Sequence, residues 1–203
     1  MAISTYAELK TAIADFLNRD DLSDTVLDQF IGLAESRIQR DLRHRNQEKR
    51  ATAPLNERYE ILPPDFLFMR RLTLNDGSQV QPISSAEMAD RRFKGDDIAG
   101  KPRFYYMTAN ELEFYPTPDE TYTMTMLYYA KLDSLSDDNT ATWLLVQHPD
   151  VYLYASLIDA AAYLFDEQKI TLWTQMYKQA ITELNIESKR SQFSGGALVM
   201  RNR

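Results

Sequence analysis

Proline placement is the strongest constraint that this sequence puts on its fold. Seven of the eight prolines lie between Pro54 and Pro118, and the eighth is Pro149. Proline lacks a backbone N–H and its ring clashes with the preceding turn, so it is excluded from helix interiors. The middle of the chain therefore cannot consist of long helices, whereas the flanks on both sides are free to be helical.

The N-terminal flank has the periodicity of two helices. Apolar side chains recur every three or four residues after a candidate N-cap at Ser4 or Thr5, and again after a second candidate at Asp24. The two stripes consist of Tyr6, Leu9, Ile13, Phe16 and Leu17, and of Leu27, Phe30, Ile31, Ala34, Ile38 and Leu42. A short polar turn separates them, so residues 1–48 are predicted to form an antiparallel helical hairpin.

Residues 49–133 are predicted to form an antiparallel β insert. Strand-like runs lie between turn signals: FLFMRRLTL, SQVQPI, RFYYMT, ELEFYP and TYTMTMLYY. The NDG turn at 75–77 favours a hairpin of the first two runs, because its residues tolerate positive φ, and residues 109–110 are expected to join another pair. Alternation in TYTMTMLYY is typical of a sheet with one wet face. One short helix, AEMADRRF, is expected after a cap at Ser84 or Ser85.

The C-terminal flank returns to helical periodicity. Pro149 suits the first turn of a helix that would run to about Phe165. The last helix has an apolar stripe made of Ile170, Trp173, Tyr177, Ala180, Ile181 and Leu184. Residues 134–190 are therefore predicted as a second helical hairpin, and residues 191–203, which contain a glycine pair and lack helical periodicity, as a flexible C-terminal arm.

The predicted fold class is therefore α+β. We expect a four-helix bundle made of the N- and C-terminal helical hairpins, with an inserted small antiparallel β domain and an extended C-terminal arm. The most apolar stretch, 151–165, contains Asp159 and is shorter than the roughly 20 residues that span a bilayer. The first ten residues lack the basic and apolar regions of a secretory signal. We expect a soluble protein with no membrane partner.

Charge is divided unevenly along the chain. The formal net charge is −7, which argues against a general affinity for nucleic acid. Residues 189–203 have a charge of +4, from Lys189, Arg190, Arg201 and Arg203, so residues 1–188 have a charge of −11. Such a division favours a C-terminal interaction tail.

No motif for catalysis or cofactor binding is present. The chain has no cysteine, and His44 and His148 lack metal-binding spacing. The segment 133–139 starts like a calcium loop, but the glycine and glutamate that such a loop needs are missing. Neither a glycine-rich phosphate loop nor a nucleophile elbow occurs. We therefore expect no cofactor, no metal site and no enzymatic activity.

A basic patch is predicted at the end of the second helix. It comprises Arg37, Arg40, Arg43 and Arg45, followed by Lys49 and Arg50. One interpretation is a solvated face, because cations are favoured at a helix C-terminus. The other is contact with an acidic partner surface or with phosphate. Aromatic residues are not interleaved with these arginines, so the patch does not indicate base stacking.

The order of three segments carries a resemblance to a known family. ILPPDFLFMRRL follows the first helical pair, ELEFYPTPDETYTMTMLYYAKL closes the β region, and QHPDVYLYASLIDAAAYLFDEQKITLWTQMYKQAITEL forms the last helical pair. From Tyr6 to about Leu184, this order resembles the head-to-tail adaptor proteins of short-tailed bacteriophages, the portal-binding connectors between portal ring and tail. The single motifs are degenerate, so the likeness rests on their order and spacing.

The resemblance implies a non-enzymatic virion protein at the head–tail junction, made in the bacterial host cytoplasm. Copies would form a homo-oligomeric ring, a dodecamer in that family, which binds the portal protein and a tail or nozzle protein. DNA would pass through the channel of the ring without specific binding, because an acidic wall repels phosphate. The arm would contact the portal through Phe193, Leu198, Val199, Met200, Arg201 and Arg203.

Two alternatives stay open at this point. Another tail-completion or connector protein, farther from the portal, would have a similar build. A nucleic-acid-processing enzyme would bind phosphate with the arginines from Arg37 to Arg50, and it would need a catalytic set that no motif indicates.

Overall fold

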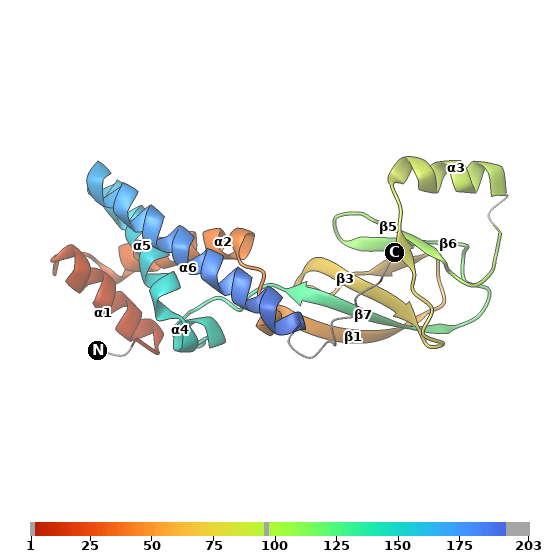
Figure 1. The fold of residues 1–203 in the computed structure, drawn as a ribbon, viewed down its shortest axis with the longest axis horizontal. Helices are drawn as coiled ribbons and strands as arrows, with labels where there is room; N and C mark the ends of the chain where they lie inside the picture. The colour runs from red at the N-terminus through yellow and green to blue at the C-terminus, as the bar shows by residue number, and fades with distance from the viewer. Residues whose placement is uncertain (1–2, 96–97, 194–203) are drawn as a thin grey trace, which may run out of the picture. The chain divides into compact units, whose positions relative to one another are not determined.

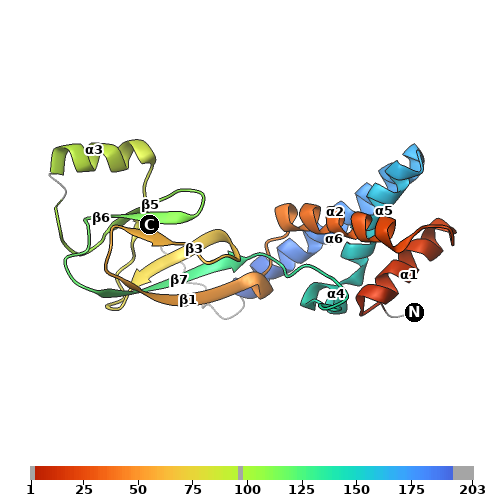
Figure 2. The ribbon, with the colours of Figure 1, turned by 180° about the vertical axis from the view of Figure 1, so that it is seen from behind.

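The computed structural model describes residues 3–95 and 98–193, and in this part the protein has the predicted mixed α+β class (Figures 1 and 2). The chain divides into two compact units. The helical unit comprises residues 1–46 and 132–203, and the β unit comprises residues 47–131. Each unit has its own cluster of buried apolar side chains, so each is described by itself.

The N-terminal pair of helices begins close to the predicted caps. Helix α1, Tyr6–Leu17, is capped by Thr5, whose hydroxyl accepts a hydrogen bond from the Glu8 N–H at 3.3 Å. The Glu8 carboxylate accepts one from the Thr5 N–H at 3.0 Å, which completes a capping box. Helix α2, Asp24–Asp41, has its cap at Ser23, so Asp24 is the first helical residue and not the predicted cap.

Three further α-helices lie in the described part of the helical unit, and a single 3-10 turn, Arg45–Gln47, follows α2. Helix α4, Trp143–Gln147, is not predicted by the sequence periodicity because it is too short to show a period. Helix α5, Pro149–Tyr163, has Pro149 in its first turn as predicted. Helix α6, Glu167–Phe193, continues past residue 190, so residues 191–193 of the predicted arm are helical.

Helix α5 lies at the centre of the helical unit. It contacts α1, α2, α4 and α6, and α1 also contacts α2 (Figures 1 and 2). This position follows from its composition, since a helix that is apolar nearly all round can be buried only by neighbours on several sides. Among the described helices, none is both long and apolar enough to cross a membrane.

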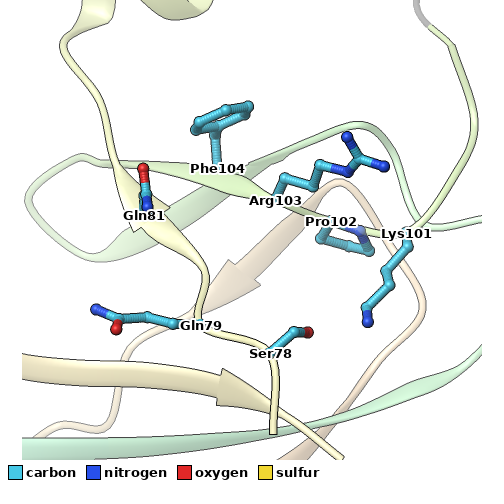
Figure 3. Close-up of a pocket in the computed structure, with 7 residues that line it drawn as sticks. All are labelled: Ser78, Gln79, Gln81, Lys101, Pro102, Arg103 and Phe104. Atoms are coloured by element: carbon cyan, nitrogen blue, oxygen red, sulfur yellow. The ribbon is translucent and has the colours of Figure 1, made fainter. Parts of the chain in front are cut away.

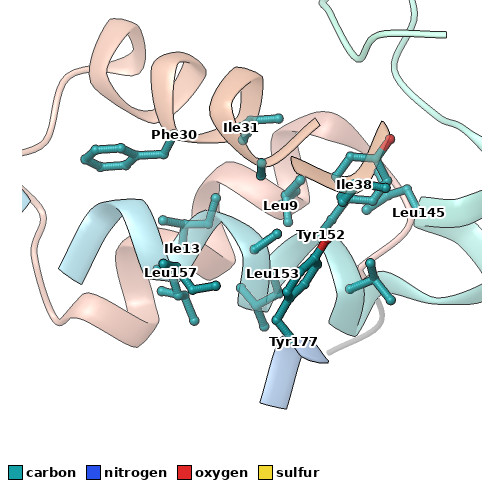
Figure 4. Close-up of a cluster of buried hydrophobic side chains, with 14 of the residues drawn as sticks. Leu9, Ile13, Phe30, Ile31, Ile38, Leu145, Tyr152, Leu153, Leu157 and Tyr177 are labelled. Carbon is teal, nitrogen blue, oxygen red and sulfur yellow. The ribbon is translucent and has the colours of Figure 1, made fainter. Parts of the chain in front are cut away.

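The core of the helical unit is built from the predicted stripes. Figure 4 shows Leu9 and Ile13 of α1, Ile31 and Ile38 of α2, and Tyr152 of α5 in one cluster. Each of these side chains is at most 1% exposed. Full burial of a side chain of this kind contributes roughly 1.5–3 kcal/mol. All six residues of the predicted α2 stripe are buried: Leu27, Phe30, Ile31, Ala34, Ile38 and Leu42.

Some positions predicted as core are exposed. Phe16 of the α1 stripe is 52% exposed. On α5, Ala162 and Tyr163 face solvent, whereas Ala160 and Ala161 are buried. Tyr163 still packs edge-on against Phe30 of α2, with ring centroids 5.6 Å apart, because the neighbours of a nearly all-apolar helix decide which side is covered.

The first sheet of the β unit is antiparallel, with the order β1-β7-β3. Its strands are β1, Glu48–Leu55, β3, Phe66–Leu74, and β7, Tyr122–Ala130. Along β7, Met124 and Met126 are buried while Thr123 is exposed. This alternation confirms the prediction of one wet face.

The second sheet has the order β2-β6-β5-β4. Its strands are β2, Tyr59–Ile61, β4, Gln81–Pro82, β5, Phe104–Met107, and β6, Glu111–Tyr115. Strands β5 and β6 form the antiparallel pair predicted around residues 109–110. Strand β4, however, pairs with β5 in parallel. The prediction of a purely antiparallel β unit is therefore wrong.

The turn at 75–77 forms as predicted, but the hairpin it begins is short. Gly77 has φ 81°, in the left-handed region that favours glycine. Past the turn, the Val80 N–H still donates to the Leu72 carbonyl at 3.0 Å. The chain then leaves β3 and joins the second sheet as β4, so the predicted strand SQVQPI is divided between two partners.

Candidate assembly surfaces

Arg37 of the predicted basic patch lies between α2 and α5. Its guanidinium donates to both carboxylate oxygens of Asp159, at 2.9 and 2.8 Å, and to the Ala155 carbonyl at 2.8 Å. The side chains of Arg37 and Asp159 are 24% and 18% exposed. This two-pronged geometry is the strong form of an arginine–carboxylate pair. The charge of Arg37 is thus used inside the helical unit, where it ties α2 to α5.

The other three arginines lie where α2 ends. The Arg43 guanidinium donates to the carbonyls of Gln39 and Leu42, at 3.1 and 2.5 Å, and so satisfies acceptors at the helix C-terminus. Arg40 and Arg45 are exposed and Arg43 is half-buried. Contact of Arg40, Arg43 and Arg45 with a partner stays a prediction.

Polar side chains of α6 fasten the end of α2. The Asn185 side chain accepts from the Arg43 N–H at 2.8 Å and donates to the Asp41 carbonyl at 3.0 Å. The Tyr177 hydroxyl donates to the Asp41 carboxylate at 2.9 Å. Burial and this hydrogen bond raise the pKa of Tyr177. These contacts fix the part of α6 that leads to the C-terminal segment.

The two histidines, far apart in sequence, meet in the helical unit. His44 is 4% exposed, stacks on Trp143 at a centroid distance of 5.0 Å, and lies 6.5 Å from the His148 ring. Burial lowers the pKa of His44, and the charges of His148 and Arg45 lower it further, while Glu187 acts in the opposite direction. Residues 3–95 and 98–193 contain no group of three or more His, Cys, Asp or Glu side chains placed to hold a metal.

The predicted portal contacts lie at the end of the described chain or beyond it. Phe193 is the last residue of α6. Leu198, Val199, Met200, Arg201 and Arg203 lie outside the described residues. Their role therefore stays a prediction.

In the β unit, one carboxylate holds helix α3, Ser85–Gly95, against the second sheet (Figure 1). Glu113 of β6 accepts from Arg92 of α3 at 2.7 Å, and from two nitrogens of Arg58 at 2.9 and 2.6 Å. Arg92 also donates to the Phe114 carbonyl at 2.6 Å. The predicted cap forms as well, since the Ser84 hydroxyl accepts from the N–H of the third helical residue at 3.2 Å.

An open pocket of about 370 Å³ lies between the segments that lead into β4 and β5. Figure 3 shows its lining residues, Ser78, Gln79, Gln81, Lys101, Pro102, Arg103 and Phe104. The Lys101 ammonium is paired with Asp76, and the Arg91 guanidinium lies 4.0 Å from the Phe104 ring centroid. The lining contains no acid and no histidine, so it lacks a general base.

Several large apolar side chains are exposed although the sequence predicts no surface role for them. Phe165, Phe93 and Ile61 are 92%, 90% and 81% exposed. Phe165 has φ 57°, a conformation that normally favours glycine after a helix. Strand β2, which carries Ile61, was not among the predicted strands. The alternation of Tyr59 and Ile61 beside the LPPD turn is the signal that could have indicated it.

Comparison with known proteins gives one family. A family model described as SU10 adaptor protein matches residues 4–201, which is nearly the whole chain and includes both units. No curated protein shows a significant match to the chain. The coverage agrees with the resemblance to phage head-to-tail adaptors that the order of segments indicates. The chain therefore belongs to the SU10 adaptor protein family, a family of phage head–tail adaptors.

Proposed function

We propose that this protein is a non-enzymatic adaptor whose copies form a ring between the portal and the tail and extend the DNA channel. The observation that carries the proposal is the family match over residues 4–201. A match across both units relates the whole build of the chain, and not one module, to phage adaptors. A structural role in the virion follows from the family; the ring, the channel and the portal contact are the proposed part.

In this proposal, α1, α2, α5 and α6 form a four-helix bundle that packs side by side with the bundles of neighbouring copies. Support comes from α5, which contacts α1, α2 and α6, and from the Arg37–Asp159 pair that ties α2 to α5. A closed ring needs two different, complementary faces on each copy. The assembled ring is proposed to be a dodecamer.

The charge distribution supports a channel wall that does not bind DNA. Residues 1–46 and 132–188 contain 17 acidic and 8 basic side chains, a net charge of −9. Such a field repels phosphate and lets DNA slide. Replacing the exposed carboxylates one by one with lysine should slow DNA ejection for those that face the channel. If no substitution in the series changed the ejection rate, this part of the proposal would be wrong.

The C-terminal segment 191–203 is proposed to dock on the portal. Phe193, Leu198, Val199 and Met200 would make apolar contacts, and Arg201 and Arg203 would contact acidic portal side chains. The exposed Arg40 and Arg45, with Arg43, are proposed as a second partner contact.

Pull-down with portal rings tests the docking. A chain truncated after Phe193 keeps α6 whole, so it should stay folded and lose portal binding. The matched control replaces residues 194–203 with a glycine–serine segment of equal length, which should also fail to bind. Normal binding of either variant would refute the proposed docking. A full chain that bound a tail protein but no portal ring would be a connector farther from the portal.

A further inference from the structure

In the described residues, the β unit has four outer strands, and three of them contain a proline or a register shift, which discourage pairing with another chain. The outer strands are β1 and β3 in the first sheet and β2 and β4 in the second. Prolines, charges and bulges on an edge strand protect it from pairing. Strand β1 contains Lys49, Arg50 and Pro54, β3 has two register shifts, and β4 is two residues long and ends at Pro82. Strand β2 is three residues long and contains one charged residue, Glu60, but it has no proline and no register shift.

The register identifies the backbone groups of β2 that point away from the sheet. Arg58 accepts from β6 and Leu62 donates to the turn before β6, each through a backbone hydrogen bond of 2.9 Å. In an antiparallel ladder, bonded positions alternate with positions that point away. Tyr59 and Ile61 therefore direct their N–H and C=O groups to the open side of β2. In the part of the chain that the structure describes, no strand pairs with that side.

The side chains at this edge are apolar and exposed. Ile61 is 81% exposed and Tyr59 is 47% exposed. They share one face, because side chains alternate along a strand. An open groove of about 380 Å³ continues from the end of β2 and is lined mainly by apolar side chains, among them Ile61, Pro63 and Phe66. An unpaired edge with exposed apolar side chains is a ready acceptor for an added strand.

The acceptor edge is also acidic. Glu57 precedes β2 and Glu60 lies within it, whereas the cation between them, Arg58, is paired with Glu113 at 2.6 Å. Burial and the negative charge of Glu57 raise the pKa of Glu60. A cation that arrived beside these two carboxylates would therefore reduce an existing repulsion.

One segment of this chain matches the edge in both respects. Residues 197–203, ALVMRNR, combine an apolar run with two arginines and contain no carboxylate. We propose that β2 binds residues 197–201 of another copy of the chain as an added strand. In a strand, Leu198 and Met200 lie on one face, so they would pack beside Tyr59 and Ile61.

Opposite charges would favour the orientation of the added strand that brings Arg201 and Arg203 near Glu57 and Glu60. The donor segment and the acceptor edge are different surfaces, so copies add head to tail, as a ring requires.

This inference goes beyond the proposed adaptor function, because it concerns copies that are not bound to a portal. It uses the segment that is proposed to dock on the portal. A portal ring would therefore compete with β2 for this segment, and copies would exchange one contact for the other during assembly.

The first test measures binding of a labelled synthetic peptide, residues 194–203, to the chain truncated after Phe193, by fluorescence anisotropy. Saturable binding is expected. Ile61→Pro removes an outward N–H without removing a bond to β6, so it should weaken binding roughly tenfold or more. Ile61→Lys should also weaken binding, whereas the matched control Phe68→Lys, at a 56% exposed position of β3, should not. Circular dichroism checks that each variant is folded.

The second test is sedimentation of the full chain. It should self-associate as concentration rises, whereas the chain truncated after Phe193 and the full-length Ile61→Pro variant should stay monomeric. No peptide binding, equal binding to the Ile61 variants, or a full chain that stays monomeric above the peptide dissociation constant would each overturn the proposal. Portal binding is measured separately, and the full-length Ile61→Pro variant should retain it. Failure of portal docking is therefore distinguishable from failure of strand exchange.

Discussion

The ion pair between α2 and α5 should be a main determinant of the stability of the helical unit. Arg37→Met keeps most of the aliphatic stem but leaves the Asp159 carboxylate and the Ala155 carbonyl without their donor. Removing one partner of a fully buried ion pair costs about 3–5 kcal/mol. Because Arg37 and Asp159 are 24% and 18% exposed, solvent screens part of their interaction. We therefore expect a loss of about 2–3 kcal/mol in the free energy of unfolding.

A double-mutant cycle separates charge pairing from packing. Arg37→Met combined with Asp159→Leu removes both charges, so the double variant should lie within about 1 kcal/mol of the wild type. Because Asp159→Leu alone also costs stability, the coupling energy should then be at least about 2 kcal/mol. The matched control is the Arg19–Asp21 pair, whose side chains are 42% and 66% exposed. Its coupling energy should be much smaller, because solvent screens an exposed pair.

Urea unfolding followed by tryptophan fluorescence is the appropriate assay. Both tryptophans of the chain, Trp143 and Trp173, belong to the helical unit, so their emission reports this unit alone. Far-ultraviolet circular dichroism reports both units and serves as a comparison. A coupling energy for Arg37 and Asp159 no larger than that of the control pair would refute the reasoning.

Three further predictions concern single residues. Thr5→Ala removes the α1 cap and should lower the free energy of unfolding by about 1 kcal/mol in the same titration; an unchanged midpoint would contradict this. The native pKa of His44 is lowered, so the unfolded chain binds its proton more readily, and stability should fall as pH decreases below about 6.5. His44→Phe should flatten this dependence, and an equally steep fall would argue against the assignment. Glu113→Gln should weaken the attachment of α3 and accelerate amide exchange there while exchange in β7 stays unchanged; unaltered exchange in α3 would show that the carboxylate does not hold the helix.

Sequence periodicity is sufficient for helices whose two sides differ. Helix α2 has a single apolar stripe, and all six predicted stripe residues are buried, because only one side can face the core. Helix α5 is apolar nearly all round, so its pattern does not distinguish the buried Ala160 and Ala161 from the exposed Ala162 and Tyr163. That distinction depends on α1, α2 and α6, which the sequence of α5 does not specify.

In the β unit, local turn chemistry is predictable and distant pairing is not. The turn at 75–77 forms because Gly77 accepts a positive φ. The strand after it, β4, pairs with Phe104 and Tyr105 of β5, and no local pattern specifies a partner so far along the chain. The short strand β2 was missed because its alternation covers only three residues and its partner, β6, lies about 50 residues later in the chain.

The candidate surfaces also depend on contacts between distant residues, which local sequence does not specify. The sequence indicates a group of arginines from Arg37 to Arg45, but the role of each depends on what the fold brings near. Arg37 meets Asp159 and Arg43 meets helix carbonyls, whereas Arg40 and Arg45 stay exposed. A list of basic residues therefore overstates the charge that is available to a partner.

Electron microscopy of portal rings mixed with this protein tests the adaptor assignment most directly. The account predicts a ring of copies on one face of the portal, with the portal's own symmetry, and added density along the portal that is lost when the chain is truncated after Phe193. Portal rings that carry no added density at saturating protein concentration would contradict it.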